Sequence, residues 1–340
     1  MSEKRSTSHV VIELLFVIAP DALLLDIAGP AEAFRLANLH RALQGLSPHF
    51  RLRFVGPEPA ANSSVGLRLA GLEPLPEQLP TPTWIVLVGQ PAVHATTASP
   101  AIHTIAQWLN RVLYGRLGAQ GCPHRLVTIC SGTLLAARAG LLDNRRCTTH
   151  HELLPSLRVL APRAQVVANR VYLMDGPLAS SAGITAGIDL ALQLIANACG
   201  EALAASIAQD MVVYLRRSGD DPELSPFLSH RRHMHPAVHH VQDAINAEPR
   251  RDWSMQTLAA LGNVTPRHLL RLFVEQAGVS PLLFLQTIRL ERARQSLEHG
   301  ANVTLAAESA GFRSGLHLRR AWKRRWGGSP RDLRSRALDA

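Results

Sequence analysis

The chain has 340 residues, and 36 Lys and Arg against 26 Asp and Glu give it a net charge of +10 at neutral pH. This length exceeds one typical domain, so we expect two folding units. No apolar run approaches the ~20 residues that a membrane span needs, and the four cysteines lack C-x-x-C spacing. We therefore expect a cytoplasmic protein with no membrane partner, no zinc site and no disulfide framework.

Short apolar runs alternate with helical patterns in the first two-thirds of the chain. Continuous apolar strands between helices indicate a parallel sheet covered on both faces, so residues 9–213 are predicted to form an α/β domain. The glycines at 115, 118 and 121 have dinucleotide-fingerprint spacing but follow a helix and precede a strand, which favours a flexible loop. The predicted strands are residues 10–18, 52–55, 84–88 and 126–129, and the predicted helices are residues 30–39, 101–113, 134–139 and 184–198.

A cysteine lies where the fourth predicted strand passes into the next helix. Cys130, followed by Ser131 and Gly132, has the sequence position of a nucleophile elbow, where the helix dipole lowers a thiol pKa and backbone N–H groups face a ligand. A nucleophile also needs a base within hydrogen-bond reach, and no histidine adjoins Cys130. We therefore favour a non-catalytic pocket cysteine over an active Cys–His pair with His150.

Two more side chains are candidates for this pocket. Asp26 follows the first strand and is either a helix-capping residue or a pocket carboxylate that binds a cationic group. His150 is either a hydrogen-bonded buried histidine or a ligand contact. The ligand-pocket candidates are Asp26, Cys130, Ser131 and His150, and no catalytic residue is predicted.

A segment without periodicity follows the α/β domain. Residues 216–226 are rich in turn formers and charge, so we predict a linker over residues 214–235, with coupling between the domains through residues 214–240. A histidine cluster at 230, 233, 235, 239 and 240 comes next. Because no cysteine or carboxylate stands at ligand spacing, a solvated helix entrance near DNA or the domain interface is favoured over a metal site. We predict no metal and no cofactor.

Most of the net positive charge lies in the last third of the chain. Residues 228–340 hold 18 Lys and Arg against 9 Asp and Glu, a net charge of +9, which leaves +1 for residues 1–227. Lys323 is the single lysine among those 18. The planar fork of arginine suits phosphates and guanine edges, so this basic part is the candidate for nucleic-acid binding.

A repeat with an offset of 49 residues lies in the basic part. Each copy has a short helix, a turn at a glycine, a Thr265 or Ser314 cap and a second helix with an arginine, which is the helix-turn-helix pattern. Residues 282–297 predict a helix of ~24 Å between the copies, long enough to let two recognition helices enter major grooves ~34 Å apart. The recurring residues are Gly262, Leu269, Arg271, Gly278, Ser280 and Pro281, which return as Gly311, Leu318, Arg320, Gly327, Ser329 and Pro330.

Helical periodicity separates the two faces of each recognition helix. An ordinary charged surface helix is the alternative, and the joint recurrence of caps, glycines and arginines favours DNA binding. The inward residues are Leu269, Leu272 and Phe273 in the first copy and Leu318 and Trp322 in the second. The outward residues are Arg267, His268, Leu270 and Arg271 in the first copy and Arg319, Arg320 and Lys323 in the second.

Residues 236–335 resemble the AraC family of transcriptional regulators. The resemblance is carried by Leu269-x-Arg271-x-Phe273, Gly278-x-Ser280-Pro281, Arg289-Leu290, Ala310-Gly311-Phe312 and Gly327-x-Ser329-Pro330. It implies an all-α double helix-turn-helix domain that binds double-stranded promoter DNA and works with RNA polymerase, most simply as a homodimer. It also places base contacts on Arg267, Leu270 and Arg271 in the first motif and on Leu316, Arg319 and Arg320 in the second.

Residues 9–213 are similar to the PfpI-like, class I glutamine amidotransferase-like domains. The similarity is carried by residues 26–34, Cys130-Ser131-Gly132, Thr148-Thr149-His150 and residues 181–189. Such a domain is a parallel-sheet, flavodoxin-like sandwich, and with an AraC-type segment it defines the GlxA family. The resemblance implies a regulator whose first domain senses a small-molecule effector or dimerises. The alternative is a PfpI-like cysteine hydrolase or amidase with a nucleic-acid-binding tail.

Overall fold

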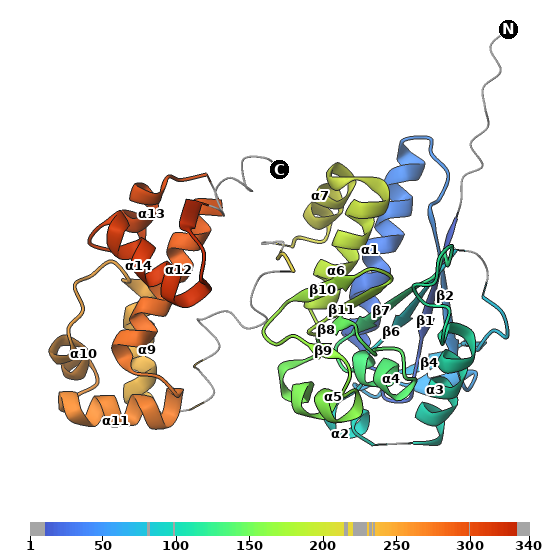
Figure 1. Ribbon diagram of the computed structural model, residues 1–340, viewed down its shortest axis with the longest axis horizontal. Helices are drawn as coiled ribbons and strands as arrows, with labels where there is room; N and C mark the ends of the chain where they lie inside the picture. The colour runs from blue at the N-terminus through green and yellow to red at the C-terminus, as the bar shows by residue number, and fades with distance from the viewer. Residues whose placement is uncertain are drawn as a thin grey trace, which may run out of the picture. The chain divides into compact units, whose positions relative to one another are not determined.

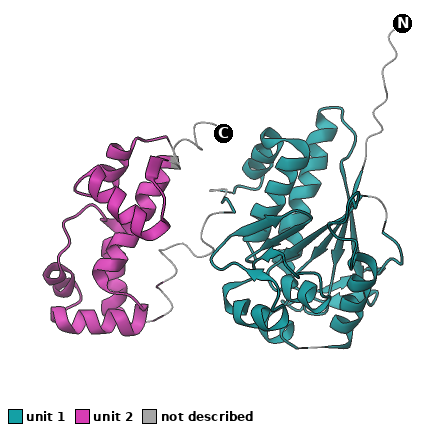
Figure 2. Cartoon of the chain, viewed as in Figure 1, with its two compact units in different colours: residues 1–223 teal, residues 224–340 magenta. Residues whose placement is uncertain are grey.

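The computed structural model describes residues 11–79, 82–97, 99–213, 217–219, 230, 233, 235–298 and 300–331. The chain divides into two compact units, residues 1–223 and 224–340 (Figure 2). This division falls within the predicted linker, residues 214–235, most of which lies outside the described residues.

A seven-stranded sheet forms the centre of the first unit (Figure 1). Its order is β10-β11-β7-β6-β1-β2-β5, with every neighbouring pair parallel except β10 and β11. The strands are β1 (Ile12–Val17), β2 (Phe50–Gly56), β5 (Glu73–Pro74), β6 (Thr83–Leu87), β7 (Arg125–Ile129), β10 (Tyr172–Asp175) and β11 (Leu178–Ser181). Two short pairs lie outside this sheet, namely β3 (Ala60–Asn62) with β4 (Arg68–Ala70) and β8 (Arg146–Cys147) with β9 (Gln165–Val166).

Helices cover both faces of the sheet (Figure 1). Strands β1 and β6 are buried along their whole length, which explains why they are continuous apolar runs. The predicted two-faced α/β sandwich is therefore confirmed. One face carries α1 (Leu24–Leu43), α6 (Ala186–Cys199) and α7 (Glu201–Asp210), and the other carries α2 (Ala92–Ala95), α3 (Pro100–Leu113), α4 (Gly132–Arg138), the 3-10 turn His151–Leu153 and α5 (Leu154–Leu160).

Helix α1 begins at Leu24, earlier than its predicted start at Pro30, so Pro30 lies inside the helix. Its ring removes a backbone N–H that would otherwise donate to the preceding turn. The helix continues because α1 and α6 pack closely around this point. A Cβ added to Gly29 would lie 2.7 Å from Cγ1 of Ile188, and one added to Gly187 would lie 3.4 Å from Cγ of Pro30.

The second unit consists of helices in the residues that the structure describes (Figure 1). It has two separate cores. The first includes Phe273 and Phe284, and the second includes Leu318 and Trp322. Helix α12, which matches the predicted helix over residues 282–297, contributes to both. The helices are α9 (Pro236–Ala247), α10 (Met255–Leu261), α11 (Pro266–Ala277), α12 (Pro281–Glu298), α13 (Val303–Ala310) and α14 (Gly315–Trp326).

Within the described ranges, no helix has both the length and the apolar character needed to cross a bilayer.

Candidate functional site

Helices α11 and α14 begin at the predicted caps. Thr265 Oγ1 accepts a hydrogen bond from the backbone N–H of His268 at 3.3 Å, and Ser314 Oγ accepts one from His317 at 3.2 Å. Each cap satisfies a donor that a helix start would otherwise leave unpaired. The repeated caps therefore place two equivalent helix starts in one unit.

The two helix-turn-helix motifs turn differently. In the second motif, Gly311 lies in the predicted turn and has a left-handed backbone, with a φ of 85°. In the first, Gly262 is in the right-handed helical region, and Asn263 takes the positive φ, 51°. The predicted turn at Gly262 is present, and its left-handed position falls on the next residue, because asparagine tolerates that region.

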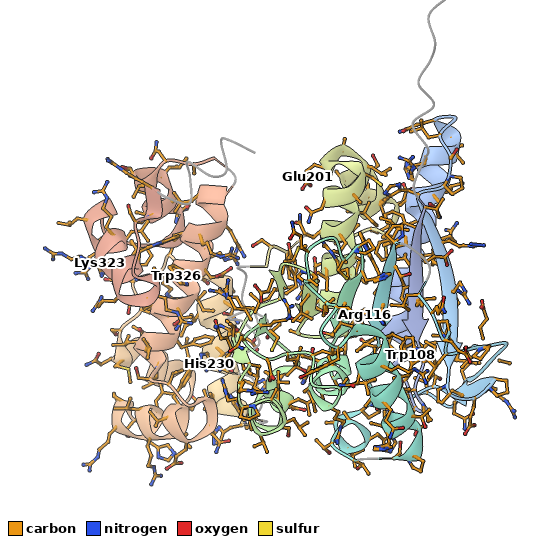
Figure 3. All side chains as sticks on the ribbon, turned by 45° about the vertical axis from the view of Figure 1, so that its right-hand side comes forward. Trp108, Arg116, Glu201, His230, Lys323 and Trp326 are labelled. Atoms are coloured by element: carbon orange, nitrogen blue, oxygen red, sulfur yellow. The ribbon has the colours of Figure 1, made fainter. Side chains whose placement is uncertain are left out.

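The candidate DNA-contacting side chains lie on the outer faces of α11 and α14. All of them are exposed except His268, which is half-buried. The predicted inward residues are buried, namely Leu269, Leu272, Phe273, Leu318 and Trp322. The exposed candidates are Arg267, Leu270, Arg271, Leu316, Arg319, Arg320 and Lys323, and Figure 3 labels Lys323 on α14.

Arg271 has polar neighbours on its own helix. Its Nη2 lies 3.2 Å from Nδ1 of His268, and its Nε lies 3.9 Å from Oε1 of Glu275. Exposed ion pairs of this kind contribute little in water, so Glu275 does not prevent the guanidinium from meeting a base. Helix α14 contains no acidic residue, so Arg319 and Arg320 have no carboxylate on their own helix.

In the first unit, Cys130 occupies the tight turn between β7 and α4. Its φ is 54°, the left-handed conformation of a strand-to-helix elbow. The backbone N–H of Cys130 donates to the carbonyl of Ser181 at 3.1 Å. Its carbonyl accepts from Oγ1 of Thr149 at 2.8 Å. The elbow is thus held between β11 and the segment that leads to His150.

Glycines close the space around Cys130. A Cβ added to Gly183 would lie 2.7 Å from the Cys130 Sγ, and one added to Gly89 would lie 2.8 Å from the Cys130 Cβ. The same point at Gly89 is 2.5 Å from Oδ2 of Asp26 and 3.1 Å from the Ser131 nitrogen. Asp26, Cys130 and Ser131 therefore converge on Gly89, and only 4% of Cys130 is exposed.

Asp26 is fully buried in the first turn of α1. Burial raises the pKa of its carboxyl to about 7, although hydrogen bonds from the backbone of Gly89 and Ile184 act in the opposite direction. Oδ2 accepts from the Gly89 N–H at 3.1 Å. Asp26 does not cap α1, because the capping position is Leu23. The capping alternative is therefore wrong, and the pocket role of Asp26 stays a prediction.

The other two pocket candidates have different surroundings. Ser131 Oγ donates to the Gln90 carbonyl at 2.8 Å and accepts from the Gln90 N–H at 2.6 Å. These bonds join the loops after β6 and β7, so the Ser131 hydroxyl has a structural role. His150 is half-buried, and its ring centroid lies 4.2 Å from that of His151.

A cavity of about 340 Å³ lies beside this centre, at the start of α1. None of the four predicted pocket residues lines it. Its lining includes Leu23, Leu24 and Leu25, which flank Asp26 in sequence, and Ile184, which follows Gly183. An apolar pocket of this size suits a small ligand. Sequence reasoning missed it because Leu23–Leu25 lie between a predicted strand and a predicted helix, and the pocket also needs Ile184, which is distant in sequence.

Arg217, within the predicted linker, is bound to the first turn of α6. Its backbone N–H donates to Oδ1 of Asp189 at 3.0 Å, and its Nε and Nη2 donate to Oδ2 at 2.9 and 2.7 Å. Nη2 also donates to Oγ1 of Thr185 at 2.9 Å. Asp189 is buried, and Arg217 supplies a counter-charge to its carboxylate. Thr185 follows the Gly183–Ile184 loop that touches Cys130.

Two histidines of the cluster contact backbone carbonyls. His230 Nδ1 lies 2.9 Å from the carbonyl of Ala277, and His239 Nε2 contacts the carbonyl of His233. Across the described part of the chain, no three His, Cys, Asp or Glu side chains are grouped closely enough to hold a metal ion.

Comparisons with known proteins match both units. Residues 258–336 match the model of a helix-turn-helix domain, and residues 123–197 match that of the DJ-1/PfpI family. The chain is 30% identical over 338 residues to the HTH-type transcriptional regulator GlxA of Rhizobium meliloti, covering 98% of each chain. The chain belongs to the GlxA family. This GlxA-family protein is a DNA-binding transcriptional regulator with an AraC-type helix-turn-helix domain behind a DJ-1/PfpI domain.

Two further relatives are a regulator and an enzyme. The HTH-type transcriptional regulator CdhR of Pseudomonas aeruginosa is 28% identical over 317 residues, which cover 93% of the GlxA-family chain and 89% of CdhR. Isonitrile hydratase of Pseudomonas putida is 42% identical over 86 residues, 24% of the GlxA-family chain and 35% of the hydratase. The DJ-1/PfpI fold therefore occurs in both regulators and an enzyme.

We expect Asp26→Asn to change how stability depends on pH. The pKa of the Asp26 carboxyl is about 7 in the folded protein, whereas in the unfolded chain it lies near its ordinary value of 3.8. Ionisation therefore destabilises the wild type as the pH rises through this window, by up to about 4 kcal/mol. The stability of Asp26→Asn relative to wild type should increase between about pH 4 and about pH 7 and then level off, measured by urea unfolding. An Asp26→Asn curve that runs parallel to that of wild type contradicts the assignment.

We expect Arg271→Ala and Arg320→Ala each to weaken specific DNA binding by about 1–3 kcal/mol, as for a base-edge arginine. Footprints should place the two effects about one helical turn apart. Affinity should fall steeply with salt through counterion release. Arg35→Ala, which removes an exposed charge from the first unit, is the control. If both variants lose protection at the same base pair, α11 and α14 do not contact separate parts of the operator.

Proposed function

We propose that the first unit is a non-catalytic sensor for a small molecule, whose binding changes how the second unit acts on promoter DNA. The observation that carries this proposal is the apolar cavity of about 340 Å³, which shares Ile184 with the loop over Cys130. The effector would have an apolar body that fits among Leu23–Leu25 and a polar group directed toward the buried centre at Asp26. We also propose a cytoplasmic homodimer that works with RNA polymerase.

A cysteine hydrolase or amidase with a DNA-binding tail is the second candidate. It is favoured by the positive φ of Cys130 and by the relative that is an isonitrile hydratase. A reactive cysteine needs an accessible thiolate. Gly183 packs against the sulfur, and Cys130 is nearly inaccessible, so a substrate carbonyl has no room beside Sγ unless the loop moves. This closure supports the sensor.

The route between the sensor and the second unit would begin with the Gly183–Thr185 loop. Gly183 touches the Cys130 sulfur, Ile184 lines the cavity, and Thr185 accepts a hydrogen bond from Arg217. A ligand that displaces Ile184 would therefore change the binding of Arg217. This agrees with the expectation that coupling runs through residues 214–240, of which residues 217–219, 230, 233 and 235–240 are described.

Cys130→Ala should alter the response to effector while leaving basal operator affinity unchanged, because the residue lies in the sensor. A promoter-reporter dose response measures the first effect, and a gel-shift titration without effector measures the second. Purified wild type should show no turnover in a screen of amide, ester, peptide and isonitrile substrates. Turnover that disappears in Cys130→Ala identifies an enzyme and rejects the sensor proposal.

Releasing Arg217 should expose Cys130. We expect Arg217→Gln/Asp189→Asn, which removes both charges together, to speed alkylation of Cys130 by iodoacetamide about tenfold, because the Gly183–Thr185 loop opens more often. Peptide mass spectrometry distinguishes Cys130 from the other cysteines. Arg163→Gln, which breaks an exposed ion pair with Asp143, is the control. Equal labelling rates in both variants show that the loop and Arg217 are not coupled.

A further inference from the structure

The two helix-turn-helix motifs contact each other at the turn that precedes α14. Gly311, in the turn of the second motif, packs against the loop before α10. A Cβ added to Gly311 would lie 2.6 Å from the Cα of Arg250 and 2.9 Å from the carbonyl oxygen of Pro249. Packing on separate halves of α12 does not by itself require this close approach. The contact therefore constrains the two motifs beyond what their separate cores do.

Arg289 of α12 holds the loop against Gly311. Its Nε donates to the Pro249 carbonyl at 2.7 Å, and its Nη2 donates to the Arg251 carbonyl at 2.8 Å. The Cβ added to Gly311 would be only 3.2 Å from this Nε. Arginine keeps its charge at neutral pH, so both bonds are charge-assisted and stronger than neutral ones. Arg289, residues 249–251 and Gly311 are called the clamp below.

The loop side of the clamp is fixed to the first motif. Trp253 is buried in the first core, and its indole N–H donates to the Glu248 carbonyl at 2.8 Å. The guanidinium of Arg251 lies 4.4 Å from the centroid of the Trp253 ring. Ser254 follows at once and caps α10 with a reciprocal pair of bonds to Thr257. The loop therefore moves together with the first motif.

The other side of the clamp lies close to the second recognition helix. Gly311 ends α13 and shortly precedes Ser314, which caps α14. At the same junction, Arg313 Nη2 is 3.8 Å from Oδ1 of Asp252, an exposed pair that adds little in water. A displacement at Gly311 is therefore transmitted to the start of α14 over a very short stretch of chain.

We propose that Arg289 and Gly311 are positioning residues that fix the angle between α11 and α14, and so set the number of base pairs allowed between two half-sites. This rests on the DNA-binding function of the second unit. One added base pair moves a half-site by ~3.4 Å and rotates it by about 34° around the DNA axis. If the two motifs can pivot about α12, both keep their DNA contacts after this change. If the clamp holds them, one motif loses contacts with its half-site.

The glycine test uses two substitutions that each place a side chain in the left-handed region. Gly311 and Gly327 both end a helix with a positive φ, 85° and 80°. A Cβ at Gly327 meets nothing within 4 Å, whereas one at Gly311 separates the clamp. Full-length protein is titrated on an operator selected from random-sequence DNA, with the half-sites moved by about one base pair in either direction. Wild type and Gly327→Ala should lose about tenfold or more in affinity, and Gly311→Ala less than about threefold.

Variants at Arg289 test the same clamp without changing a glycine. Arg289→Gln should weaken the spacing preference, and Arg289→Lys should partly restore it, because one charged donor remains. Binding to a single half-site should stay within about twofold of wild type for each variant, and circular dichroism checks the helices. If Gly311→Ala does not fold, the Arg289 pair decides.

Three results overturn the proposal. The first is a wild-type spacing preference in Arg289→Gln. The second is an equal loss of affinity at every spacing, which indicates a purely structural role. The third is a spacing preference weakened as much by Gly327→Ala as by Gly311→Ala, which indicates general strain in the unit.

Discussion

The first unit depends on the convergence of three chain turns at the carboxyl edge of its sheet. Gly89 follows β6, Gly132 follows β7 and Gly183 follows β11, and a Cβ at any of them would overlap a neighbour. At Gly132 that Cβ would come within 2.2 Å of the Leu87 carbonyl oxygen. The resulting density removes water from Asp26, holds Cys130 in its elbow and presses the loop after β11 onto the sulfur. The raised pKa of Asp26 and the inaccessibility of the Cys130 sulfur thus have the same cause, which is close packing around these glycines.

The second unit is organised around a shared helix. Each helix-turn-helix motif has a small core of its own, and α12 supplies Phe284 to one and Leu297 to the other. A three-helix motif buries little apolar surface alone, so sharing a long helix stabilises both. Because α12 packs in both cores, the arrangement of α11 and α14 depends on the folded domain and not on a flexible spacer.

Local patterns in the sequence were sufficient for much of this structure. The caps at Thr265 and Ser314, the inward faces of α11 and α14 and the buried parallel strands follow from periodicity and hydrogen-bonding chemistry, and they are confirmed. Pro30 shows where such patterns fail, because close packing of α1 on α6 outweighs a local helix-start signal. The cavity beside Asp26 and the ion pair of Arg217 depend on contacts between residues distant in sequence, which no local pattern encodes.

A carboxyl with a pKa of about 7 gives the centre at Asp26 two chemical forms near neutral pH. The protonated form donates a hydrogen bond and suits a ligand carbonyl, whereas the ionised form suits a cationic group. Binding of the first kind of ligand takes up a proton, and binding of the second kind releases one. For the effector proposed above, whose polar group would have to reach the buried Asp26, the sign of the proton exchange that accompanies binding would therefore report the charge of that group.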